Sequence, residues 1–82
     1  MFEIEFGADY ADSYEIRTRP EDWDGAMTAL SNTLAEFVDR RLIDHDDFVA
    51  AMEWVTGVVI DDVNVRHSQT FGYLGVSVTL TD

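Results

Sequence analysis

The stretch from Thr18 to Gly57 constrains the fold most, because it contains two successive helical repeats of apolar residues. In the first repeat, apolar side chains recur at alternating spacings of four and three, at Trp23, Met27, Leu30, Leu34 and Phe37, with Val38 and Leu42 beside them. This spacing places them on one stripe of a helix. Thr18 and Glu21 form a capping-box pattern at its start, and Pro20 suits the first turn.

A second helix is predicted to begin at Asp44 and to end at Gly57, a residue type common at helix ends. Asp44 is a favourable N-cap residue. Asp46 and Asp47 place negative charge in the first turn, where it complements the helix dipole. The apolar repeat runs at spacings of four and three through Phe48, Met52 and Val55, with Val49 and Ala51 alongside.

Alternating patterns flank the helical stretch and predict strands. Residues 2–6 alternate apolar side chains with Glu3 and Glu5, and residues 14–18 alternate around Arg17. These two segments predict an antiparallel hairpin in which Arg17 lies across from Glu3 or Glu5.

The C-terminal part of the chain predicts a second hairpin. Residues 58–60 are β-branched, Asp61-Asp62 is interpreted as a bulge or turn, and residues 63–66 alternate. Residues 67–70 predict a polar turn, and residues 74–80 alternate most regularly.

The element order β-β-α-α-β-β predicts an α+β fold of a single domain spanning residues 1–82. We expect a two-layer sandwich, in which two helices cover one face of a four-stranded antiparallel sheet. The expected core contains Ile4, Leu30, Leu34, Phe37 and Val78.

Composition limits the class of protein. The chain has no cysteine, which excludes disulfides and thiolate chemistry and suits a reducing compartment. It has no apolar run long enough to cross a membrane, and its alternating first residues are unlike a signal peptide. We therefore expect a cytoplasmic protein.

The charge is the most unusual property of the chain. Seventeen acidic residues outnumber five basic ones, all of them arginine, and the net charge is −12. Binding to nucleic acid through phosphates requires a basic surface, so the charge argues against it. Two explanations remain: carboxylates that bind a basic partner protein, or a surface adapted to high salt. The absence of lysine also fits a GC-rich coding bias.

No motif in the sequence assembles a catalytic, metal or cofactor site. Residues 44–47 are Asp-His-Asp-Asp, but the apolar Phe48 and Val49 stand at the fifth and sixth positions, where an EF-hand loop would need an oxygen ligand and a glycine. A hydrolytic site would pair His45 or His67 with Ser68 or Asp62. However, no nucleophile elbow, zinc motif or phosphate-binding loop surrounds either histidine. We expect no enzyme activity and no cofactor.

Carboxylates crowd the first 24 residues and the turn between the helices, whereas from Ser68 onward the only acid is Asp82. Trp54 lies off the apolar stripe of its helix, so its ring is expected to be partly exposed, and aromatic residues are enriched at interfaces. The predicted partner contacts are Glu3, Glu5, Glu15, Asp22, Asp24, Asp44, Asp46, Asp47 and Trp54.

Small size, strong acidity and the lack of a catalytic motif make the chain similar to phage-encoded inhibitors of host defence, such as anti-CRISPR proteins and other DNA mimics. The resemblance covers the whole chain in size and charge alone, because those inhibitors share no motif. It implies an inhibitor that blocks a basic, nucleic-acid-binding surface of a partner protein in the host cytoplasm. The alternative is an acidic α+β domain from a haloarchaeal or GC-rich genome, with an unknown interaction role.

A salt series separates the two explanations of the charge. A chain adapted to molar salt should unfold below about 1 M, because its carboxylates repel one another once the screening length exceeds about 3 Å. An inhibitor from an ordinary cell should remain folded near 0.15 M salt, the physiological range. Circular dichroism across the series measures this, and unfolding at low salt would favour the halophile.

Overall fold

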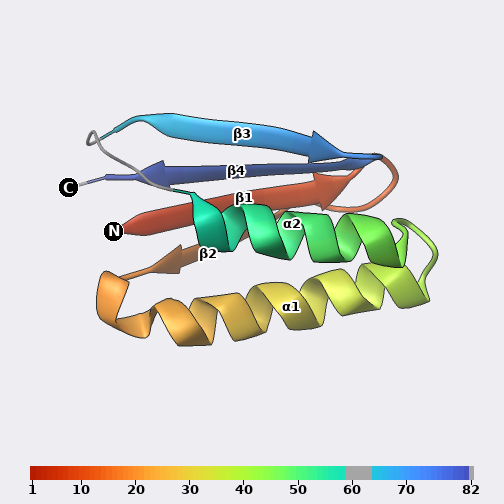
Figure 1. The fold of residues 1–82 in the computed structure, drawn as a ribbon, viewed down its shortest axis with the longest axis horizontal. Helices are drawn as coiled ribbons and strands as arrows, with labels where there is room; N and C mark the ends of the chain where they lie inside the picture. Colours follow the sequence, from red (N-terminus) through yellow and green to blue (C-terminus); the bar gives the residue numbers. More distant parts are fainter. Residues whose placement is uncertain (59–63, 82) are drawn as a thin grey trace.

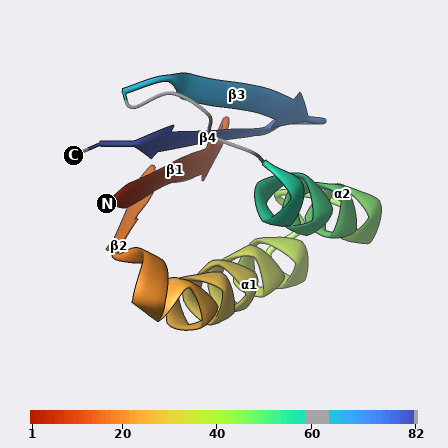
Figure 2. The ribbon, with the colours of Figure 1, turned by 60° about the vertical axis from the view of Figure 1, so that its left-hand side comes forward.

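The computed structural model describes residues 1–58 and 64–81. In chain order, the elements are β1 (Phe2–Ala8), β2 (Tyr14–Thr18), a 3-10 turn (Pro20–Asp22), α1 (Trp23–Asp39), α2 (His45–Gly57), β3 (Arg66–Phe71) and β4 (Leu74–Leu80). The strands form one antiparallel sheet in the order β2-β1-β4-β3, and both helices cover one of its faces (Figures 1 and 2). The predicted fold class and element order are confirmed.

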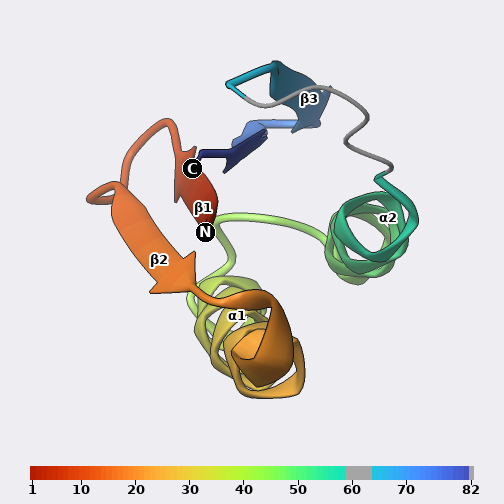
Figure 3. The ribbon, with the colours of Figure 1, turned by 90° about the vertical axis from the view of Figure 1, so that its left-hand side faces the viewer.

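The first and last strands form the centre of the sheet. β1 and β4 pair along their whole length, from Phe2 opposite Leu80 to Ala8 opposite Leu74. β2 and β3 are then the two edges of the sheet, as the end-on view in Figure 3 shows. This pairing also sets which residues face the helices, because successive side chains of a strand point to opposite faces.

The core lies between the sheet and the helices. Leu30, Leu34 and Phe37 of α1 are fully buried against Ile4 of β1 and Val78 of β4, as predicted. The remaining buried apolar residues of the described chain are Phe6, Ala8, Ala26, Ile43, Ala51, Val55, Leu74 and Val76. Neither helix in residues 1–58 or 64–81 is long and apolar enough to cross a membrane.

The predicted start of the first helix is wrong in detail. Thr18 is the last residue of β2, and its hydroxyl donates a hydrogen bond to the carbonyl of Arg19 instead of capping a helix. Pro20 opens the 3-10 turn, and α1 begins only at Trp23. β1 pairs with the backbone of Thr18, which keeps this residue extended, so the strand prevails over the local capping pattern.

The start and end of the second helix are confirmed. The backbone N–H of Asp44 donates to the carboxylate of Asp47 at 3.4 Å, which is one half of a capping box. The helix runs from His45 to Gly57, and Asp46 and Asp47 occupy its first turn.

The C-terminal hairpin exists, but its predicted turn is wrong. Residues 67–70, predicted as a polar turn, belong to β3, and the chain reverses at Gly72 and Tyr73, between the paired Phe71 and Leu74. Gly72 has a φ of +60°, and glycine at the first central position is typical of a type II′ hairpin turn. The predicted strand pattern of residues 59–63, with Asp61-Asp62, lies outside the described residues.

Leu34→Ala tests the core. Leu34 has no exposed surface and lies in the centre of the core cluster, so the substitution should lower the free energy of unfolding by about 2–5 kcal/mol. Asn32→Ala, on the exposed side of the same helix, is the control and should change it by less than about 0.5 kcal/mol. Urea denaturation measures both, and equal losses would remove Leu34 from the core.

Candidate functional site

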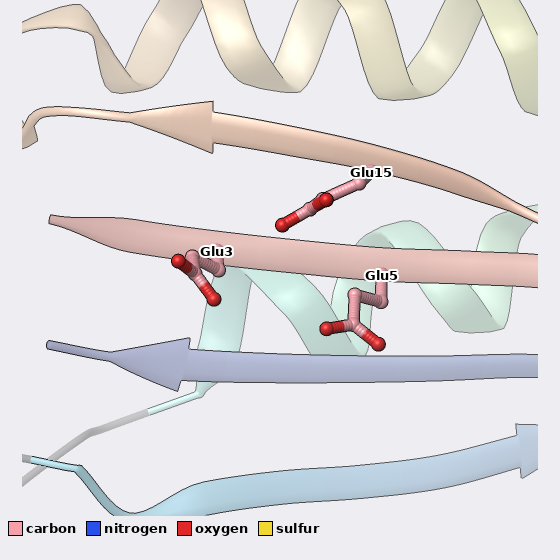
Figure 4. A group of neighbouring side chains, drawn as sticks. All are labelled: Glu3, Glu5 and Glu15. Atoms are coloured by element: carbon pink, nitrogen blue, oxygen red, sulfur yellow. The ribbon is translucent and has the colours of Figure 1, made fainter.

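The face of the sheet away from the helices carries a cluster of three glutamates. Glu3 and Glu5 project from β1 and Glu15 from β2, and their carboxylate oxygens lie within 4.8 Å of one another. Figure 4 shows Glu15 extending from β2 toward β1, on the side of the sheet opposite the helices. The cluster forms because Glu5 is paired directly with Glu15, and Glu3 lies two residues away on the same face.

Two arginines, one from each edge strand of the sheet, bind this cluster. The Nε of Arg17 lies 2.9 Å from Glu15 and 3.5 Å from Glu3, which confirms the predicted placement of Arg17 across from Glu3. The hydrogen bond that Arg17 donates to Glu15, and the charges of Glu15 and Glu3, raise the pKa of Arg17 above its ordinary value. Arg66 of β3 donates to Glu5 at 3.0 Å and to the hydroxyl of Ser77 at 2.9 Å. The two arginines therefore neutralise most of the negative charge of the glutamate cluster.

A polar hollow of about 440 Å³ lies beside the glutamate cluster on the same face. Gly75 leaves space there, because a Cβ atom built on it would meet nothing within 4 Å. Gly7, its partner across β1 and β4, is instead approached closely by Ser13, whose Cα would lie 3.2 Å from such a Cβ. Glu5, Arg66 and the hydroxyl of Ser68 are among the groups that line it.

A second acidic surface lies at the end of the fold where β1 and α1 end and α2 begins (Figure 1). We call this surface the aspartate end; its acidic residues are Asp9, Asp12, Asp39, Asp44, Asp46 and Asp47. Arg40 and Arg41 lie in the connection between the helices at the same end. No salt bridge joins any of these residues in the part of the chain that the structure describes.

At the aspartate end, α2 makes a close contact with the β3–β4 turn. A Cβ atom built on Gly72 would lie 2.6 Å from the Oδ2 of Asp47, so the carboxylate packs directly on the glycine. On the other side, Ala8 pairs with Leu74, which places the β1–β2 connection next to the same turn.

Two exposed tyrosines accompany these aspartates. Tyr10, in the β1–β2 connection, is 88% exposed, and Tyr73, in the β3–β4 turn, is 67% exposed. Neither tyrosine is among the partner contacts that the sequence predicts. Their common position follows from the pairing of β1 with β4, which a local pattern does not reveal.

The remaining predicted contact residues lie elsewhere. Asp22 and Asp24 are at the start of α1, near the contact between Phe2 and Trp23, and therefore at the opposite end of the fold. Trp54 is only partly exposed, since its ring packs against that of Phe71 at a centroid distance of 6.0 Å. The predicted residues thus belong to three separate surfaces, with Trp54 on none of them.

The histidines do not assemble with the predicted hydrolytic partners. His67 and Ser68 are adjacent in β3 and so point to opposite faces of the sheet. The Nε2 atom of His67 is buried and has no hydrogen-bond partner among residues 1–58 and 64–81. His45 is exposed at the start of α2 and stacks on Phe48, and Asp62 lies outside the described residues.

Comparison with known proteins adds no assignment, because no family model, curated protein or solved structure matches the chain.

Gly72→Ala tests the contact that organises the aspartate end. Alanine at a φ of +60° is strained, and its Cβ would collide with Asp47, so the free energy of unfolding should fall by about 1–3 kcal/mol. Gly75→Ala is the matched control, because a Cβ there meets nothing within 4 Å and φ is not positive. Thermal denaturation measures the stability of both variants. If Gly72→Ala is as stable as Gly75→Ala, the described contact between Gly72 and Asp47 is contradicted.

Proposed function

We propose that the protein is a small binding module that inhibits a nucleic-acid-handling partner by covering its basic surface. In this proposal it acts in the cytoplasm, has no enzymatic activity and does not bind nucleic acid itself. The class of inhibitor is the one that its size and charge resemble, the phage-encoded anti-CRISPR and DNA-mimic proteins.

One observation carries the proposal: among the residues that the structure describes, the aspartate end combines carboxylates that form no salt bridge with two exposed tyrosines. Carboxylates attract a basic surface and accelerate association with it. Tyrosines supply large apolar contacts, and they are enriched among the residues that contribute most to protein interfaces. The glutamate cluster fits this role less well, because Arg17 and Arg66 already bind its carboxylates.

The alternative, a domain adapted to high salt, is favoured by a different observation. The acidic residues are distributed over the sheet face and both ends of the fold, as expected if they serve hydration. The salt series described above separates this alternative from the inhibitor.

The test compares equal losses of charge at the two ends. One triple variant removes three carboxylates from the aspartate end: Asp44→Asn, Asp46→Asn and Asp47→Asn. Asparagine preserves the side-chain shape and can still serve as the N-cap of α2. The matched control is Glu21→Gln, Asp22→Asn, Asp24→Asn at the start of α1. A partner isolated from host lysate with the tagged protein is titrated with each variant, and displacement of its nucleic acid is measured at about 0.05 and 0.5 M salt.

We expect the variant of the aspartate end to bind more weakly than the control, mainly through slower association, and parent binding to weaken as salt rises. Tyr10→Ser with Tyr73→Ser should reduce binding at least about tenfold. If both charge variants bind like the parent, the acidity serves solvation and the proposal is wrong. Equal losses in both would instead show that the whole acidic surface acts without a preferred end.

A further inference from the structure

We propose that two copies of this chain associate by antiparallel pairing of β3 with β3, which joins their sheets into one eight-stranded sheet. The inference is independent of the proposed function, because it concerns the edge of the sheet and not the aspartate end.

β3 is a sheet edge without the protection that edge strands usually have. It pairs with β4 on one side only, and within the described residues no strand pairs with its other side (Figure 3). Its unpaired backbone groups can therefore accept another strand. Edge strands are commonly protected by lysine or proline, and β3 contains neither.

The only formally charged residue of β3 points away from the free edge. Arg66 extends across the sheet to Ser77 on β4 and Glu5 on β1, so its guanidinium does not guard the outer side of β3. The opposite edge is different, because β2 carries both Glu15 and Arg17 in a strand of five residues.

The distribution of charge favours a second copy over a basic partner at this edge. Residues 64–81 contain no acidic residue; Asp61, Asp62 and Asp82 lie outside the described residues, and all other acids lie in residues 1–58. A basic partner would be attracted to the acidic surfaces and gains nothing from this edge. Two copies of net charge −12 repel each other, and β3 against β3 is the approach that brings no carboxylate of the strands together.

The strand is also compatible with its own sequence in antiparallel pairing. When Ser68 lies opposite Ser68 of the second copy, Arg66 lies opposite Thr70, and both residues face away from the helices. The two Arg66 side chains are then four residues apart along the strand, about 13 Å. Six residues of strand make a smaller interface than stable complexes have, so the dimer should be weak and concentration-dependent.

The experiment is sedimentation equilibrium of the full chain at about 0.1 and 0.5 M salt. We expect a dimer that strengthens as salt rises, since salt screens the repulsion between copies; docking to a basic partner has the opposite dependence. Ser68→Glu places one carboxylate of each copy opposite the other across the paired strands. Their repulsion should weaken the dimer about fivefold. Asn32→Glu adds the same charge on the exposed side of α1, and it should leave the dimer within about twofold of the parent.

A charge-swapped mixture tests the register. Ser68→Glu mixed with Ser68→Arg should associate more strongly than either variant alone, because opposite charges then face each other. Hydrogen exchange of the parent should show β3 amides that gain protection with concentration, a readout that does not depend on any variant folding. A parent that stays monomeric in both salts, or a dimer that Asn32→Glu weakens as much as Ser68→Glu, would overturn the proposal.

Discussion

The pairing of β1 with β4 is the interaction on which the rest of the structure depends. It joins the two ends of the chain in the centre of the sheet, and without it the two hairpins would be separate and marginal. It places Ile4 beside Val78 under the helices, and Glu5 beside Ser77 on the open face. It also sets the β1–β2 connection next to the β3–β4 turn, which creates the aspartate end.

Local patterns predicted those features that local physics determines. The apolar stripe of α1 and the N-cap of α2 depend on residues a few positions apart, and both were confirmed. The predicted cap at Thr18 is wrong because this residue pairs with Phe2 of β1. A capping pattern, which depends on residues a few positions apart, does not reveal that pairing. The stripe also extends to Leu42, but α1 ends at Asp39: Arg41 takes a φ of 60° there, and Leu42 donates to the carbonyl of Phe37.

The β3 strand was missed because its sequence lacks a strand pattern. Residues 67–70 are all polar or weakly apolar, which is typical of a turn, and their neighbours Gly72 and Tyr73 carry a weaker turn signal. The pairing with β4 forms this edge strand, since the backbone N–H and C=O groups of β4 on the side away from β1 need partners. The same nonlocality explains why Arg66 was not linked to Glu5: sixty-one positions separate them in sequence, and only the sheet order β1-β4-β3 brings them together.

Sheet order also converts an uneven distribution of charge along the sequence into distinct surfaces. The acid-free residues 64–81 form β3 and β4, so one half of the sheet carries no carboxylate of its own. Arg66 bridges this half to the acidic β1 and compensates Glu5. Within the described chain, the aspartate end and the acidic start of α1 are left without salt bridges. Salt therefore acts in opposite directions on the two proposed contacts. Screening weakens attraction at the aspartate end and relieves repulsion between copies at β3. A single ionic-strength series thus distinguishes contacts that the negative charge of this protein strengthens from contacts that the same charge weakens.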